Sequence, residues 1–443
     1  MSKRSRIYLL GAALLSLSAC GGGGGGSSTT TPTPAETSSP TAGSTPAPAE
    51  TSPPAVTGFD FQSMFTNLAD NVIIPNYESF DIAAEAFAST DGPLETYCAS
   101  LGTEAESVVA DNFSAAQTTW RELMTLWQRA EVHTLGPAAD DASFLRNRIY
   151  AYDTAPLDTC LTDRVVVLAE EADFDVSLRS VSARGLDALE YLLFNEDLTH
   201  SCTTANEQTD SWNARPELER MQARCDYALD LALDIGEAAT AIHEAWLPTE
   251  GNFRETFIGN PDTSEVILST VSDAMFYIEQ DSKDNKLGIP LGINDGCDAL
   301  ACPEAVESPL SNNALQNLRA NIESFADLYT GVDGLSFDDI ISAADLDSIN
   351  TAFAGDAEDI TNLIDSMIAD DANLQTQAQS ILDSVDGADT DACAASSTNP
   401  TVDTTVSGCA LYGLFSRQND RLRTDFITVV GVDLPNRVQG DSD

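Results

Sequence analysis

The sequence predicts an all-α protein of two packed antiparallel helical bundles, and three observations support this fold class. Apolar residues in the longer segments recur every three or four positions, as they do on one face of an α-helix. Alternating apolar and polar runs, which are typical of β-strands, are few. Hydrophobic residues make up 42% of the 443 residues, which is enough to build a core for most of the chain.

The first twenty residues predict a lipoprotein signal. Three basic residues precede the apolar run 7–19, which is too short to cross a hydrocarbon core of ~30 Å. The run closes on Leu17-Ser18-Ala19-Cys20, which resembles the bacterial lipobox. That resemblance implies removal of residues 1–19 and a lipid anchor on Cys20; the alternative is an ordinary signal peptide with an incidental Cys. Gly21, by resemblance to enterobacterial sorting, implies the outer membrane, facing the periplasm.

A tether is expected at residues 20–57, which after Cys20 consist almost entirely of Gly, Ser, Thr, Pro and Ala. Such a composition buries too little apolar surface to offset the entropy lost on ordering. The whole chain carries a formal charge of −50, from 21 Lys and Arg against 71 Asp and Glu. We therefore expect no nucleic-acid partner, because phosphate contacts need clustered basic residues.

Nine cysteines support an oxidising compartment. If Cys20 carries lipid, eight remain, and an even number predicts up to four disulfides. Local pairing predicts Cys202–Cys225, Cys297–Cys302 and Cys393–Cys409, which leaves Cys98–Cys160. A metal cluster is the weaker alternative, because the sequence has no CxxC and only three histidines.

Helices are expected wherever the three-to-four spacing persists, with Pro75 kinking or interrupting the first of them. The segments are 64–88, 104–132, 178–194, 216–247, 264–281, 312–330, 336–354, 358–384 and 411–430. One echo, 76–80 against 321–325, places a similar NxESF sequence in each half of the chain. We expect the two bundles to span 58–255 and 256–438.

One mid-chain segment, 184–194, could carry chemistry. Asp187 and Glu190 are three positions apart, so on a helix they share a face, and apolar residues surround them. Two buried carboxylates repel each other, so one must bind a proton, a cation or an arginine. Glu131 offers a third carboxylate, and such oxygen ligands suit hard cations such as Ca²⁺, or iron when a His joins them. In the simpler alternative the acids are solvated or pair with Arg129, Arg146, Arg148 or Arg184.

The segment 185–194, GLDALEYLLF, resembles the GxHxxE motif of the imelysin family and the aromatic-Leu-Leu run that follows it. Further landmarks occur in the family's order over residues 60–436. They are 67–80, Trp120 and Trp127 with Glu131 and Gly136-Pro137, the ESPLSNN segment 307–313, 329–331 and 422–432.

The resemblance implies two α-helical bundles in the cell envelope, an association with iron uptake, and a suspected metal or iron-bearing ligand near the junction of the halves. By position, Asp187 stands where the motif has His, and Glu190 and Glu131 match family glutamates. We predict Glu131, Asp187 and Glu190 as metal ligands for iron or Ca²⁺. The other motif candidates are Trp120, Gly185, Ser308, Ser311 and Asn313.

Three functions follow from these observations. The first is a non-catalytic envelope lipoprotein that binds iron, another cation or a partner in an iron-uptake system. The second is a metallopeptidase, which the family name alone supports, because Asp187 replaces the motif His and no HExxH is present. The third is a structural or docking module that holds a protein or glycan between the bundles.

Overall fold

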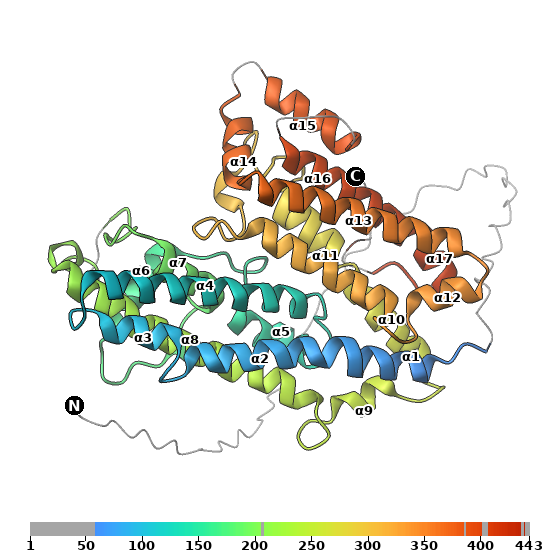
Figure 1. Ribbon diagram of the computed structural model, residues 1–443, viewed down its shortest axis with the longest axis horizontal. Coiled ribbons are helices and arrows are strands. Elements are labelled where there is room, and N and C mark those ends of the chain that lie inside the picture. Colours follow the sequence, from blue (N-terminus) through green and yellow to red (C-terminus); the bar gives the residue numbers. More distant parts are fainter. Residues whose placement is uncertain (1–57, 205–207, 385–386, 401–405, 436–437, 439–443) are drawn as a thin grey trace, which may run out of the picture. The chain divides into compact units, whose positions relative to one another are not determined.

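A computed structural model of the protein describes residues 58–204, 208–384, 387–400, 406–435 and 438. Within these ranges every regular element is a helix, which confirms the all-α prediction (Figure 1). The predicted signal peptide 1–19, Cys20 and the tether to residue 57 lie outside the described residues. No helix among the described residues is long and apolar enough to cross a membrane.

The first helical stretch runs without a break from α1 into α2. α1 (Phe61–Asn67) continues as a π-helical segment (Leu68–Ile73) and then as α2 (Ile74–Ala88). Pro75 is the second residue of α2, directly after the π-helical segment, and it has no N–H to donate to a carbonyl of that segment. The expected interruption is therefore a change of helix type just before Pro75.

Longer α-helices and short 3₁₀ turns make up the rest of the first part of the chain. The α-helices are α3 (Pro93–Ser100), α4 (Glu106–Glu131), α5 (Asp140–Ile149), α6 (Thr159–Leu168), α7 (Gly185–Phe194), α8 (Glu217–Trp246) and α9 (Phe253–Ile258). The 3₁₀ turns are Gly136–Ala138, Val176–Leu178, Val181–Ala183 and Trp212–Ala214.

The second part contains a long π-helical segment, η6 (Ile278–Gly288), directly after α10 (Ser264–Met275). A 3₁₀ turn (Pro303–Ala305) leads toward the later helices. These are α11 (Ala314–Thr330), α12 (Phe337–Ala343), α13 (Asp347–Ala369), α14 (Leu374–Leu382), α15 (Ala388–Thr398), α16 (Ser407–Arg421) and, after a π-helical turn (Leu422–Phe426), α17 (Ile427–Val430).

Three predicted helices are wrong in extent. Only 185–194 of the predicted 178–194 is α-helical, because the backbone is extended at Arg184. The predicted 336–354 is split between α12 and α13, where Asp345 has a φ of 60°. The predicted 358–384 is split between α13 and α14, where Asp371 has a φ of 52°. A left-handed residue ends an α-helix locally, and apolar periodicity does not reveal it.

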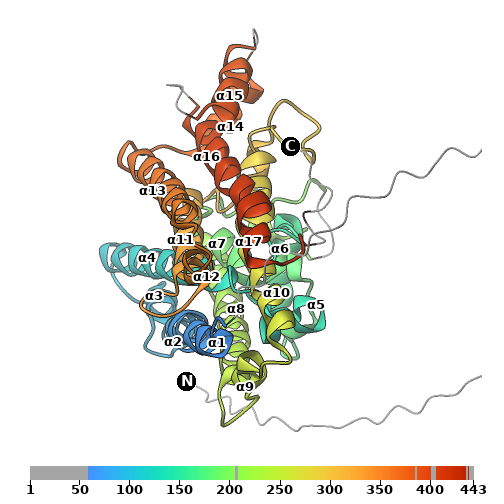
Figure 2. The same cartoon turned by 90° about the vertical axis from the view of Figure 1, so that its right-hand side faces the viewer.

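Helix α4 is central to the packing, because it contacts α2 on one side and α11 on the other (Figures 1 and 2). The two NxESF segments lie on these two helices. Asn76 Nδ2 and Ser324 Oγ both lie within hydrogen-bond distance of His133 Nε2, at 2.9 and 3.1 Å. The described residues belong to one compact unit, and the division into bundles 58–255 and 256–438 stays a prediction.

The disulfide pairing corrects the sequence prediction at two of four bonds. Cys297–Cys302 and Cys393–Cys409 form as predicted. The predicted Cys202–Cys225 and Cys98–Cys160 are wrong, since the bonds are Cys98–Cys225 and Cys160–Cys202. Tertiary packing decides this pairing: α3 lies against α8, and the segment after α7 lies against α6.

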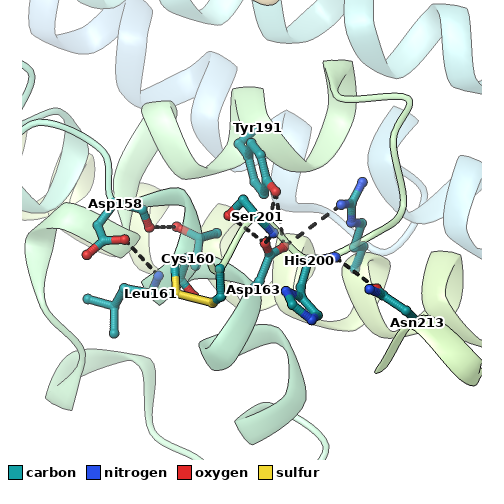
Figure 3. The surroundings of a disulfide bond; sticks show 11 residues. Asp158, Cys160, Leu161, Asp163, Tyr191, His200, Ser201 and Asn213 are labelled. Atoms are coloured by element: carbon teal, nitrogen blue, oxygen red, sulfur yellow. Dashed lines mark hydrogen bonds and ion pairs between the residues drawn. A yellow bond between two sulfur atoms is a disulfide. The ribbon is translucent and has the colours of Figure 1, made fainter. Parts of the chain in front are cut away.

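Figure 3 shows why Cys202 lies beside Cys160. Asp163 of α6 accepts hydrogen bonds from the Ser201 N–H at 2.6 Å and the Ser201 hydroxyl at 2.8 Å. The Tyr191 hydroxyl of α7 donates to the same carboxylate at 3.0 Å. These bonds fix the segment that carries Cys202 on the surface of α6.

Candidate functional site

The candidate site begins at Gly185, the first residue of α7. Its φ is +75°, and a Cβ there would lie 2.6 Å from the carbonyl oxygen of Ile149 in α5. Only glycine combines this backbone conformation with so close an approach. The turn directs α7 into the interior, with Asp187 in its first turn and Glu190 one turn later.

Glu190 is buried and held by the segment that precedes α11. The backbone N–H and the hydroxyl of Ser311 both donate to Glu190 Oε1, each at 2.7 Å. Burial raises the pKa of Glu190 to about 7, although the bonds from Ser311 favour the ionised form. Glu190 therefore titrates near neutral pH.

Asp187 carries an unpartnered oxygen. The residue as a whole is partly exposed, but its Oδ1 is buried and has no hydrogen-bond partner. Burial raises the pKa of Asp187 well above its usual range, and the nearby carboxylates of Glu190, Glu307 and Glu131 raise it further. An ionised Asp187 is therefore costly unless a cation balances it.

Glu131 lies in the same electrostatic environment, but both of its oxygens have partners. Arg146 Nη2 donates to Oε1 at 2.5 Å, and the Tyr277 hydroxyl donates to Oε2 at 3.0 Å. Arg146 also pairs with Asp153 at 2.5 Å. Burial disfavours the charged guanidinium, yet Glu131 and Asp153 outweigh that effect and raise the pKa of Arg146.

Glu307 is a fourth buried carboxylate, which the sequence analysis quoted within a motif but did not predict as a site residue. Its Oε1 accepts from the Tyr150 hydroxyl at 2.8 Å and from Gln128 Nε2 at 3.1 Å, and Lys286 Nζ lies 3.0 Å away. Its Oε2 is buried and has no hydrogen-bond partner. Glu307 and Asp187 thus each present one unsatisfied buried oxygen.

The four arginines considered as simple partners of Asp187 and Glu190 are used elsewhere. Arg146 binds Glu131, and both Arg148 and Arg184 bind Asp234, at 2.7 and 2.5 Å. Arg129 binds Glu323 at 3.0 Å and also Asp327. The carboxylates of the site therefore outnumber the basic groups that lie among them.

The remaining motif candidates frame the site. Trp120 Nε1 donates to the carbonyl of Leu186 at 3.2 Å, which fixes the first turn of α7 on α4. Asn313 donates to Asn317 at 2.7 Å, and Asn317 donates to the Ser308 hydroxyl at 3.2 Å. These bonds order the segment that supplies Ser311 and Glu307.

The predicted metal set of Glu131, Asp187 and Glu190 can be compared with this geometry oxygen by oxygen. In the ranges that the structure describes, no group of three or more His, Cys, Asp and Glu side chains is arranged to hold a metal ion. Each oxygen of Glu131 already accepts a hydrogen bond, whereas Asp187 Oδ1 and Glu307 Oε2 accept none. Metal binding by Glu131, Asp187 and Glu190 stays a prediction.

The residues that sequence reasoning missed come from distant segments. Tyr150 follows α5, Lys286 lies in η6 and Glu307 lies in the segment before α11, and none is near Asp187 in the sequence. One signal was present for Lys286: the chain has only three lysines, and two of them, Lys283 and Lys286, are buried in η6. A lysine kept in the interior of so acidic a chain indicates a fixed partner.

Comparison with known proteins identifies relatives of the chain. The model of the imelysin family matches residues 73–395. An imelysin-like protein from Psychrobacter arcticum 273-4 is similar in structure, with a TM-score of 0.58 and 15% identity over 85% of this chain and 96% of that one. A "putative iron-regulated protein A precursor" from Parabacteroides distasonis ATCC 8503 has a TM-score of 0.51 and 15% identity over 82% of this chain and 98% of that one. Curated proteins yield no match.

Proposed function

Since the chain belongs to the imelysin family, we propose that it is a non-catalytic envelope lipoprotein that binds a hard cation beside Asp187. The observation that carries the proposal is the pair of buried, unsatisfied oxygens, Asp187 Oδ1 and Glu307 Oε2. A cation between or beside these carboxylates would offset their repulsion and satisfy both oxygens.

The type of ion follows from the donor set. Carboxylate oxygens favour hard cations, so Fe³⁺ and Ca²⁺ fit better than the softer ions that a His ligand would suit. Asp187 and Glu307 would supply only part of a coordination shell. The rest would come from water or from a chelator that arrives with the ion, which fits the partial exposure of Asp187.

Iron is the first candidate for two reasons. The resemblance to the imelysin family implies an association with iron uptake, and the name of the Parabacteroides distasonis neighbour refers to iron regulation. A lipid anchor at Cys20 would hold the protein on the outer membrane, facing the periplasm, near envelope proteins of an iron-uptake system. Peptidase activity is not part of the proposal, because Asp187 stands where the family motif has a histidine.

Calorimetric titration of the purified chain with ferric citrate, and separately with Ca²⁺, tests the proposal. We expect saturable binding of one ion by the unaltered chain and loss of that binding in Asp187→Asn and in Glu307→Gln. Glu358→Gln, an exposed position on α13, is the control and should bind as the unaltered chain does. Absence of saturable binding with either ion, or equal binding by Asp187→Asn, would overturn the proposal.

A further inference from the structure

A cavity lies where α3, α4, α7 and α8 come together. These four helices are on the left of Figure 1. The volume of the cavity is about 650 Å³, which falls within the usual range of small-molecule sites. Its walls are mainly apolar, with leucines from α7, from α8 and from the segments that follow α3 and α7, and with the side chains Val109, Phe113 and Met221. None of its lining residues belongs to the acidic site.

The walls of this cavity are held in place. The Cys98–Cys225 disulfide joins α3 to α8, and Cys225 itself lines the cavity. Arg224 donates to the carbonyls of Asn195 at 3.0 Å and Asp197 at 2.8 Å, which ties the segment after α7 to α8. A cavity with fixed walls requires little reorganisation before a ligand enters, so less affinity is lost on ordering.

The charges around the cavity select the kind of ligand. Four exposed glutamates contribute to its lining: Glu104, Glu106, Glu196 and Glu217. The single basic residue of the lining, Arg224, is buried and bound to backbone carbonyls. A fatty acid or another anionic amphiphile would face uncompensated repulsion, whereas a positively charged head group would be attracted.

Aromatic rings point to the same chemistry. Tyr97 and Phe113 both line the cavity, and their ring centroids lie 4.9 Å apart. Aromatic faces bind quaternary ammonium groups, and carboxylates in the lining of the same cavity add electrostatic attraction. We propose that this cavity is a binding site for a small cationic amphiphile: an alkyl or aryl chain that carries an ammonium group, with the chain among the leucines and the ammonium beside the glutamates.

Decyltrimethylammonium, decyl sulfate and decyl maltoside, each below its critical micelle concentration, are suitable probes for calorimetry on the purified chain. We expect saturable binding of decyltrimethylammonium at one site, about tenfold tighter than binding of decyl sulfate. Ala110→Trp should abolish this binding, because Ala110 is an exposed residue that lines the cavity and the indole would occupy its space. Circular dichroism and thermal unfolding establish that the variant is folded.

A charge-matched pair of variants separates the site from the general acidity of the chain. Glu104→Gln with Glu196→Gln removes two charges at the cavity outside any helix and should weaken decyltrimethylammonium binding by about fivefold. Glu265→Gln with Glu358→Gln removes two exposed charges on α10 and α13 and should leave binding unchanged.

Three results would overturn the proposal: no saturable binding of the cationic probe, unchanged binding in a folded Ala110→Trp variant, or equal weakening in the two double variants. Equal affinity for all three probes would overturn the charge selection, because it would show that apolar contact alone fills the cavity. The acidic site is not involved in any of these variants, so this outcome is independent of the cation titrations.

Discussion

Two aspartates, the buried Asp234 and the partly exposed Asp187 with its buried Oδ1, differ in how their carboxylates are paired. Asp234 of α8 receives Arg184 at Oδ2 and Arg148 at Oδ1, with distances of 2.5 and 2.7 Å. Asp187 lies three residues after Arg184, yet its Oδ1 has no hydrogen-bond partner. The charged groups that act on Asp187 are three glutamates and one arginine, Arg146. Arg184 pairs with Asp234 and not with Asp187, so it does not balance the charge of the acidic site.

This difference between the two aspartates reflects the small number of basic residues in the chain. It has 21 Lys and Arg against 71 Asp and Glu, so most carboxylates of the chain have no basic partner. Two arginines are placed on one structural carboxylate, which is then fully satisfied. The acidic site, with Asp187, Glu190, Glu307 and Glu131, receives Arg146 and Lys286 and keeps an excess of carboxylates. Such an excess is what a site for a proton or a cation requires.

The largest expected effect comes from removing Asp234, the aspartate whose two oxygens are both paired with arginines. Asp234→Ala leaves Arg148 and Arg184 without their buried carboxylate, so we expect a loss of about 3–5 kcal/mol in the free energy of unfolding, measured by urea denaturation. Glu237→Gln is the matched control on the same helix, because Glu237 lies 3.6 Å from Arg148 but its side chain is 74% exposed. The control should cost less than about 0.5 kcal/mol. Equal costs would contradict the structural role of Asp234.

The next largest effect is the dependence of folding stability on pH through Glu190. The pKa of Glu190 rises from an ordinary 4.5 to about 7 on folding, so between these values the folded state holds a proton that the unfolded state has lost. Stability must therefore fall as the pH rises from about 4.5 to about 7, by about 3 kcal/mol from this group alone.

Urea denaturation in the presence of a chelator, at several pH values, checks this dependence. The difference in stability between the unaltered chain and Glu190→Gln should be constant below about pH 4.5 and should shift against the unaltered chain up to about pH 7. A difference that stays flat across this window would show that Glu190 is ionised throughout. A shift of opposite sign would show that its ionised form is stabilised by folding.

Sequence reasoning succeeds where the interactions are local. The predicted segments 104–132 and 216–247 agree closely with α4 and α8, because each carries a long apolar periodicity that one helix can satisfy. The proximity of Asp187 and Glu190 was predictable for the same reason, since their spacing places them on one face of α7.

Sequence reasoning fails where distant segments decide the outcome. Glu307 and Lys286 reach Asp187's surroundings through tertiary packing of η6 and the segment before α11, and no spacing along the chain encodes that contact. The partners of Glu131, Arg146 and Tyr277, likewise come from other segments of the chain, and spacing around Glu131 does not reveal them. The pairing of Cys98 with Cys225 depends likewise on the packing of α3 against α8.

The smallest expected effect on the free energy of unfolding comes from a substitution at Asp187. Asp187→Asn keeps the shape of the side chain and removes the cost of a carboxylate whose pKa is raised well above 3.8. In the presence of a chelator at pH 7 we expect the variant to be as stable as the unaltered chain or more stable by about 1 kcal/mol. Below about pH 3.8 the gain should vanish, because Asp187 is then protonated in both the folded and the unfolded state.

Thermal unfolding with and without a saturating cation completes this test. A cation that binds the folded state must raise the stability of the unaltered chain, and it should not raise that of Asp187→Asn. The two chains would then exchange their order of stability when the ion is added. A variant that loses several kcal/mol in chelator would instead show that Asp187 is ionised and paired, as Asp234 is, and the contrast between the two aspartates would not hold.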